Sequence, residues 1–189
     1  MVKRSGLALA MLLGCAPVAA VPPEVEAEQV NIDARGGILA LGGSSAQRLA
    51  QVFAIARPGY LSHVMVPMSC QPDADVRVTI EKTTSGAPNG AMLAYEELRG
   101  RPYTSGPTPA VGMRMIEFTR PPLLGPGEYA VTLAVKGKYD CGVYAGPHGD
   151  TYPGGAAYFI ARPNPPVWIE LFDAGGTRDL AFQIYLRPL

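Results

Sequence analysis

The sequence has few charged side chains and no excess of either sign. Charged residues make up 17% of the 189 residues, against about 25% in ordinary soluble domains, and 16 basic residues balance 16 acidic ones. The chain therefore lacks the basic surface with which proteins bind nucleic acid, and nucleic acid is not an expected partner. The 22 glycines and 19 prolines leave few uninterrupted helical windows, which excludes a long helical bundle. The apolar fraction of 48% is still enough to form a core.

Chemically reactive residues are scarce as well. The sequence has two histidines, His63 and His148, and it has no G-x-S-x-G elbow, H-E-x-x-H helix or phosphate-binding loop. We therefore predict no cofactor, no catalytic residue and no enzyme activity. The alternative is a hydrolase acting on an envelope polysaccharide, which needs two carboxylates in one cleft. The candidates for that pair are the separate acids Glu96, Glu117, Asp140, Asp150 and Glu170.

The first twenty residues have the features of a secretory signal. A positively charged start precedes an apolar run over residues 6–14, which is too short to span a bilayer as a helix. Two cleavage positions remain open: before Cys15, in the lipobox-like Leu12-Leu13-Gly14-Cys15, or after Ala20. We expect the first, which makes Cys15 a lipid anchor in the membrane. The protein is then exported, either to a bacterial cell envelope (outer membrane or periplasm) or as a secreted protein.

The residues that follow the signal segment are predicted to form a flexible tether. Residues 21–30 contain two prolines and three glutamates and have no aromatic side chain, so they bury too little apolar surface to fold alone. Residues 31–189 show no internal repeat and no shift in composition, which indicates one domain.

Apolar and polar residues alternate with a period of two through the body of the chain, which indicates β-strands. The alternation is clearest over residues 75–82, 128–135 and 178–186. Weaker candidates are 51–57, 62–68, 91–98, 113–119, 156–161 and 166–171, of which 91–98 also fits a helical turn. Glycine and proline turn signals separate the strands, so we predict an all-β protein with one antiparallel β-sandwich of jelly-roll type.

The cysteines of the predicted domain form an even pair. Cys15 belongs to the signal segment, which leaves Cys70 and Cys141. The pair has no C-x-x-C spacing and no histidine cluster, so a metal site is a poor alternative. Because export permits disulfides, we predict a bridge between Cys70 and Cys141, with two buried thiols as the other interpretation.

Aromatic residues are the candidates for binding a ligand. Tyr139, Tyr144, Tyr152 and Tyr158 lie in the glycine-rich stretch 137–159, and Trp168 follows it. Such rings stack on sugars, but they also close the end of a sandwich with their hydroxyls on loop carbonyls. These residues favour a non-catalytic adhesion, structural or weak carbohydrate-binding role, with a glycan or an envelope protein as partner.

Calcium is a weaker candidate ligand, and we predict no metal site. Sandwich loops often bind calcium through carboxylates and carbonyls. The weak candidates here are Asp73, Asp75, Asp140 and Asp150. Solvated acids in turns explain the same pattern.

Several turn and core segments occur in a characteristic order. They are Gln51-Val52-Phe53, Gly59-Tyr60-Leu61-Ser62-His63-Val64, Gly86-Ala87-Pro88-Asn89-Gly90, Pro121-Pro122-Leu123, Gly127-Glu128-Tyr129-Ala130-Val131, Gly154-Gly155-Ala156-Ala157-Tyr158 and Asp179-Leu180-Ala181-Phe182-Gln183-Ile184-Tyr185. Over about residues 47–186 this order resembles the choice-of-anchor R type of bacterial extracellular β-sandwich domain. The resemblance implies an exported jelly-roll-like module with no established chemistry. The sequence departs from that pattern in Cys70, in Cys141 and in the proline-rich loop at 162–166.

Overall fold

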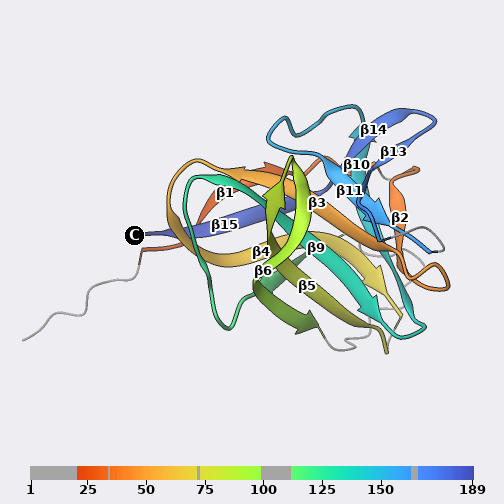
Figure 1. Ribbon diagram of the computed structural model, residues 1–189, viewed down its shortest axis with the longest axis horizontal. Helices are drawn as coiled ribbons and strands as arrows, with labels where there is room; N and C mark the ends of the chain where they lie inside the picture. Colours follow the sequence, from red (N-terminus) through yellow and green to blue (C-terminus); the bar gives the residue numbers. More distant parts are fainter. Residues whose placement is uncertain (1–20, 34, 72, 99–111, 163–165) are drawn as a thin grey trace, which may run out of the picture.

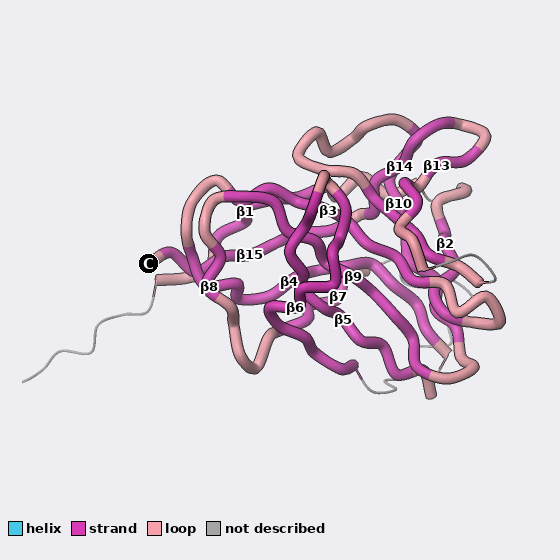
Figure 2. Tube along the Cα trace, viewed as in Figure 1, coloured by secondary structure: helices cyan, strands magenta, loops and turns pink. Residues whose placement is uncertain are grey.

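The computed structural model describes residues 21–33, 35–71, 73–98, 112–162 and 166–189. Every regular secondary-structure element in these ranges is a β-strand (Figure 1). The predicted signal segment, with Cys15, lies outside the described residues. Within the described ranges, no helix has the length and apolar character needed to cross a membrane. The strands form two antiparallel sheets packed face to face, which confirms the predicted jelly-roll-like β-sandwich (Figure 2).

The strands are β1 (Glu24–Gln29), β2 (Ile38–Gly42), β3 (Arg48–Ile55), β4 (Gly59–Cys70), β5 (Asp75–Thr84), β6 (Ala87–Leu98), β7 (Met113–Glu117), β8 (Leu123–Leu124), β9 (Gly127–Lys136), β10 (Asp140–His148), β11 (Ala157–Ile160), β12 (Ile169–Glu170), β13 (Phe172–Asp173), β14 (Gly176–Leu180) and β15 (Phe182–Pro188).

The larger sheet has nine strands and joins segments from both ends of the chain. Its order is β1-β15-β4-β10-β14-β13, with β2 beside β10 and with β7 and β8 beside β4. Gln29 in β1 lies opposite Phe182 in β15, and Glu24 lies opposite Leu186. The described start and end of the chain therefore lie at the same end of the sandwich, at the left of Figure 1.

The smaller sheet has six strands in the order β12-β11-β3-β9-β5-β6. The long β5–β6 hairpin curls over its outer surface, because β6 contacts β3 although β9 and β5 separate the two strands. At the tip of the hairpin, Gly86 has a φ of +79°, and a Cβ there would lie 3.8 Å from the Tyr158 hydroxyl of β11. The curl buries polar side chains on the outer face of the sheet, such as Glu81 and Thr132.

The core lies between the two sheets and follows the alternation seen in the sequence. Phe53, Leu133 and Ile80 point inward from the six-stranded sheet, and Phe182 and Ile184 point inward from the nine-stranded sheet. All five side chains are fully buried. Burial of large apolar side chains contributes about 1.5–3 kcal/mol each, so this layer is the main source of stability.

The predicted disulfide is present. Cys70 at the end of β4 lies opposite Cys141 in β10, and the two sulfur atoms are 2.01 Å apart. The bridge joins two hydrogen-bonded strands 71 residues apart in the sequence.

Three segments differ from the sequence-based expectation. The tether predicted over residues 21–30 is wrong for residues 24–29, because these residues form β1 and gain their backbone hydrogen bonds from β15. The glycine-rich stretch 137–159 contains a nine-residue strand, β10, which pairs with β2, β4 and β14. Residues 91–98, for which a helical turn remained open, belong to β6.

Candidate functional site

Two of the five aromatic candidates are wholly or partly buried against the core. Tyr144 lies inside β10 rather than in a loop, and its exposed fraction is 4%. Tyr139 packs against the core near the disulfide, with the Lys138 ammonium 6.0 Å from its ring centroid. The expectation that Tyr144 lies in a ligand-binding loop is therefore not met, whereas Tyr139 lies half-buried in the connection just before β10. Pairing of β10 with three other strands turns Tyr144 into a buried residue.

Tyr152 lies in the loop between β10 and β11, and its ring is fixed in place. The ring meets Phe182 edge-on with 5.0 Å between centroids, and the hydroxyl accepts a 3.1 Å hydrogen bond from the Ala54 amide. Gly154 is required below the ring, because a Cβ at that position would lie 2.5 Å from the hydroxyl oxygen. Burial raises the pKa of Tyr152, so its hydroxyl stays protonated. The loop therefore presents a preformed aromatic side chain.

A buried pair of polar side chains holds this loop to both sheets. Gln51 in β3 donates a hydrogen bond from Nε2 to Asp179 Oδ1 at 3.1 Å and accepts one at Oε1 from the Leu180 amide at 2.7 Å. The other oxygen of Asp179 accepts hydrogen bonds from the amides of Thr151 and Tyr152, both at 2.9 Å. The Gln51–Asp179 pair therefore sets the position of the loop that carries Tyr152.

A cleft of about 400 Å³ opens between this loop, β12 and β14. Its lining residues are Asp150, Tyr152, Pro153, Gly155, Ala156, Glu170, Thr177, Arg178 and Asp179. We call it the β10–β11 cleft. The strands β10, β11 and β14 lie toward the upper right of Figure 1, away from the C-terminus.

Two of the carboxylates in the β10–β11 cleft have no partner within the part of the chain that the structure describes. Asp150 and Glu170 are both exposed, and neither makes a hydrogen bond or ion pair to another residue in the described ranges. Asp179, in contrast, is buried and its oxygens are fully engaged. Asp150 and Glu170 are therefore the acids that can accept hydrogen bonds from a ligand.

The cleft continues onto the outer face of the six-stranded sheet through Glu170. Tyr158 lies directly opposite Glu170, so both side chains point to the same face, and Trp168, two residues earlier, shares it. The Arg48 guanidinium stacks on the Trp168 ring at 5.1 Å. Burial, with a contribution from the Glu170 charge, raises the pKa of Tyr158. Three of the five predicted aromatic candidates therefore gather around one carboxylate.

The floor of the cleft includes a buried arginine held by two acids. Arg178 places Nη2 3.2 Å from Asp33 Oδ2 and Nε 3.0 Å from Asp173 Oδ2; the latter contact is an ion pair without the alignment of a hydrogen bond. His148 Nε2 lies 2.5 Å from Asp173 Oδ1. The Gly175 amide above all, and then His148 and Arg178, lower the pKa of Asp173. This network holds β14 in its place between β10 and β13, so we interpret it as structural.

The remaining acidic candidates do not join the cleft. Glu96 and Glu117 line two other pockets, and Asp140 starts β10 near the disulfide. Asp73 and Asp75 lie at the β4–β5 connection. In the described part of the chain, no group of three or more His, Cys, Asp or Glu side chains is placed to hold a metal ion.

Sequence reasoning missed the residues that build the cleft. Gln51, Asp179 and Arg178 are all buried, and each lies in a stretch that reads as a plain strand. The one available signal was Gln51, an uncharged polar residue at an inward position of the apolar run 49–55. A buried polar side chain needs hydrogen-bond partners, and only the fold brings β14 beside it.

Comparison with known proteins supports the fold and does not assign a chemical function to the site. No protein-family model matches the sequence, and the search of curated proteins finds no match. One similar solved structure contains the cysteine protease and lectin-like domains of a surface layer associated protein of Clostridium difficile. The TM-score is 0.51 at 12% sequence identity, and the match covers 76% of the protein and 33% of that chain. The protein thus spans about a third of the chain it matches, and the likeness shows the fold alone.

Proposed function

We propose that the protein is an exported, non-catalytic module of the cell envelope that binds a carbohydrate in the β10–β11 cleft. One observation carries the proposal: Asp150 and Glu170, exposed carboxylates with no hydrogen-bond or ion-pair partner among the described residues, share a cleft with the fixed ring of Tyr152. Sugar hydroxyls donate hydrogen bonds to carboxylates, and their C–H faces pack on aromatic rings. Tyr158 and Trp168 extend the same chemistry along the sheet for a longer glycan.

The disulfide and the position of the chain termini support an envelope location. Disulfides persist mainly in oxidising compartments outside the cytosol. β1 begins at the end of the sandwich where β15 finishes, whereas Asp179, in the cleft, lies nine residues before Pro188. At about 3.3 Å per residue, that separation is roughly 30 Å. An anchor preceding β1, such as a lipid on Cys15, would therefore direct the cleft away from the membrane.

The lectin-like domain named for the structural neighbour agrees with this proposal but does not identify a ligand. The resemblance to choice-of-anchor R domains, which implies an anchored extracellular module, points in the same direction.

A glycan array on the purified protein, followed by titration calorimetry of each hit, tests the proposal. We expect Asp150→Asn and Glu170→Gln each to weaken a bound glycan about tenfold, because each loses a charged hydrogen-bond acceptor. Asp73→Asn removes an exposed acid outside the cleft and serves as the matched control. Unchanged affinity in both cleft variants, or an array without any hit, contradicts the proposal.

The aromatic part of the surface has its own test. Trp168→Ala should weaken long glycans more than short ones, because Trp168 lies beside the cleft rather than in it. Tyr95→Ala removes an exposed ring that is likewise stacked on an arginine, Arg77 at 4.8 Å, but on strand β6. Equal losses for these two variants would contradict a specific role for Trp168.

A polysaccharide hydrolase is the second candidate, and one observation favours it. Asp150 and Glu170 line the same cleft, and two carboxylates in one cleft are one condition that a glycosidase pair must meet. An assay for new reducing ends, on each polysaccharide that binds, distinguishes the two functions. Sugar release that disappears in Glu170→Gln, while binding persists, would replace the binding module with an enzyme.

A further inference from the structure

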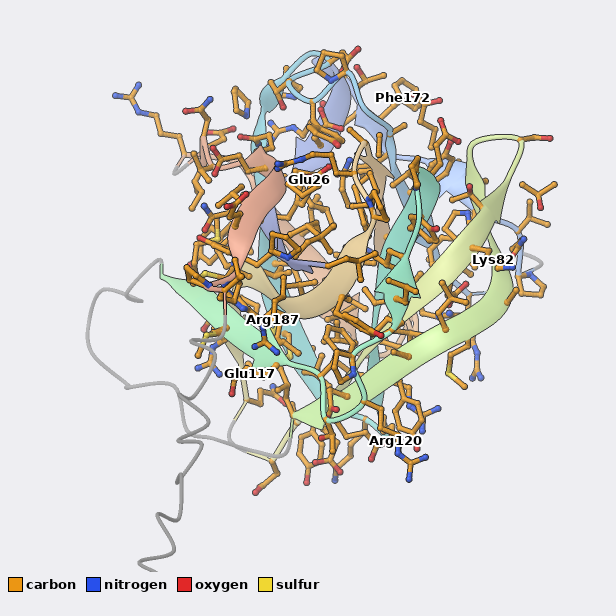
Figure 3. The ribbon with its side chains drawn as sticks, turned by 90° about the vertical axis from the view of Figure 1, so that its left-hand side faces the viewer. Glu26, Lys82, Glu117, Arg120, Phe172 and Arg187 are labelled. Atoms are coloured by element: carbon orange, nitrogen blue, oxygen red, sulfur yellow. A yellow bond between two sulfur atoms is a disulfide. The ribbon has the colours of Figure 1, made fainter. Side chains whose placement is uncertain are left out.

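A second pocket, of about 440 Å³, lies on the outer face of the nine-stranded sheet and shares no residue with the β10–β11 cleft. Its lining residues are Tyr60, Ser62, Glu117, Phe118, Thr119, Pro121 and Arg187. We call it the β4 pocket. Figure 3 shows Glu117 and Arg187 next to each other, apart from Phe172 in the β13–β14 hairpin.

A β-bulge and a tied loop form the β4 pocket. His63 pairs with Tyr185 and Leu61 pairs with Leu186, so Ser62 is an extra residue in β4. Such bulges redirect a side chain and are frequent beside binding sites. Residues 118–122 cover this point, because the Leu61 amide donates to the Pro122 carbonyl at 3.0 Å and the Phe118 amide donates to the Ser62 carbonyl at 3.5 Å. The pocket wall is therefore fixed by backbone hydrogen bonds.

Opposite charges stand on opposite walls of the pocket. Glu117 in β7 lies across from His63, and Arg187 in β15 lies across from Tyr60, so the two charged residues flank β4 on its two sides. Two strand spacings and a stagger of about three residues along β4 separate the two backbones, which is roughly 14 Å, so only the side chains reach into the same pocket. Both side chains are exposed, and neither makes a hydrogen bond or ion pair to another residue in the described ranges. Each charge is left for a ligand or for water.

The histidine beside Glu117 does not neutralise it. The His63 ring stacks on Tyr185 with 4.1 Å between centroids, and its Nδ1 lies 3.2 Å from the Ser62 hydroxyl oxygen. Burial lowers the pKa of His63 and outweighs the opposing effect of the Glu117 charge, so the ring is mainly neutral at neutral pH. His63 therefore adds no full positive charge beside the Glu117 carboxylate.

We propose that the β4 pocket binds a small zwitterion, such as an amino acid or a dipeptide. The ligand's ammonium group binds at Glu117, its carboxylate binds at Arg187, and its body lies on the half-exposed Tyr60 ring. A guanidinium binds a carboxylate through two parallel hydrogen bonds, which suits Arg187 to the anionic end. A neutral sugar would use neither charge, so this site differs in chemistry from the carbohydrate cleft and does not depend on it.

Nuclear magnetic resonance titration with three probes tests the proposal on the full exported chain. The probes are the dipeptide Ala-Ala, its N-acetyl derivative without the ammonium group, and its C-terminal amide without the carboxylate. We expect Ala-Ala to shift the amide resonances of Ser62 and Thr119, and each blocked form to bind at least fivefold more weakly. Equal binding of the three probes, or no shift with any of them, overturns the proposal.

Variants assign each charge to its partner. Glu117→Gln should abolish the preference for Ala-Ala over the N-acetyl form, and Arg187→Gln should abolish the preference over the amide. Lys82→Gln and Asp73→Asn, which remove exposed charges outside the pocket, are the controls and should change neither preference. Glutamine has the size of glutamate and is shorter than arginine, so an unchanged melting temperature is the check that each variant is folded. Preferences that survive both pocket variants refute the assignment, whatever the glycan array shows.

Discussion

Replacing Gln51 with methionine tests whether the buried polar link supports both the fold and the cleft. Gln51 is fully buried, and its side chain is hydrogen-bonded at both ends: the two N–H groups of Nε2 are shared among the Val52 carbonyl, the Gly155 carbonyl and Asp179 Oδ1, and Oε1 accepts from the Leu180 amide. Methionine has nearly the same length and shape, so Gln51→Met removes the hydrogen bonds with little change in packing. The link joins β3 of one sheet to β14 of the other.

The expected loss follows from the groups that remain without a partner. The Leu180 amide becomes a buried donor without an acceptor, which costs about 1–3 kcal/mol, and the Asp179 carboxylate loses one of its four hydrogen bonds, worth about 1.5–3 kcal/mol. The more apolar side chain returns about 1 kcal/mol of transfer free energy. We expect the free energy of unfolding to fall by about 2–4 kcal/mol, with a melting temperature lower by roughly 5–15 °C.

Urea unfolding, followed by fluorescence, measures this change. Gln183→Met is the matched control, because Gln183 lies on the outer face of β15 and hydrogen-bonds only to exposed Glu28 among the described residues. The control should cost less than about 1 kcal/mol. A double-mutant cycle with Asp179→Asn should show a coupling energy above about 0.5 kcal/mol.

Gln51→Met should also weaken glycan binding, although Gln51 does not line the cleft. The reason is that Asp179 orients the amides of Thr151 and Tyr152 only while Gln51 holds its other oxygen. A stability loss no larger than that of Gln183→Met would refute the reasoning.

Three further outcomes are expected. Replacing Cys70 and Cys141 with alanine should lower the free energy of unfolding by roughly 4 kcal/mol in the chain-entropy treatment. In the unsubstituted protein, neither cysteine should be alkylated without reductant, and labelling of both would disprove the bridge. Lys136, followed by Arg77, lowers the pKa of Glu97 from 4.5 to about 2. The ionised form of Glu97 therefore stabilises the fold. This contribution to the free energy of unfolding is present above pH 4.5 and is lost as the pH falls toward 2, so Glu97→Gln should make the free energy of unfolding depend less on pH in this range. Glu26→Ala should destabilise the protein by about 1–3 kcal/mol, because the Glu26 carboxylate accepts hydrogen bonds from two backbone amides of the β3–β4 turn. If urea unfolding shows no effect, β1 contributes little to stability and the tether hypothesis is restored for residues 24–29.

The strands that the sequence predicted are those whose own residues alternate. Residues 75–82 and 128–135 each lie within one strand, whereas 178–186 are divided between β14 and β15 at Ala181. Val78, Leu133 and Phe182 point inward, because a period of two places alternate side chains on one face. The disulfide was predictable for a similar reason, since the expected domain contains only two cysteines.

β1 and β10 escaped prediction because their own residues do not favour strands. β1 is acidic and has prolines just before it, and β10 contains glycines and a proline that are typical of turns. Both strands are stabilised by hydrogen bonds to partners far away in the chain: β15 lies more than 150 residues from β1, and β4 lies some 70 residues from β10. Pairing with a distant strand overrides local propensity, which is weaker and depends on context for β-structure.

The sequence by itself determined the class of the fold, the inward face of its clearest strands and the cysteine pair, because periodicity and composition are local properties of the chain. The tertiary structure alone decided the site. It brought Asp150 and Glu170 into one cleft, removed Tyr144 from solvent, and gave Gln51 its partners in β14. Those outcomes depend on which strands become neighbours, and residues far apart in the sequence come into contact only when both sheets have closed over a common core.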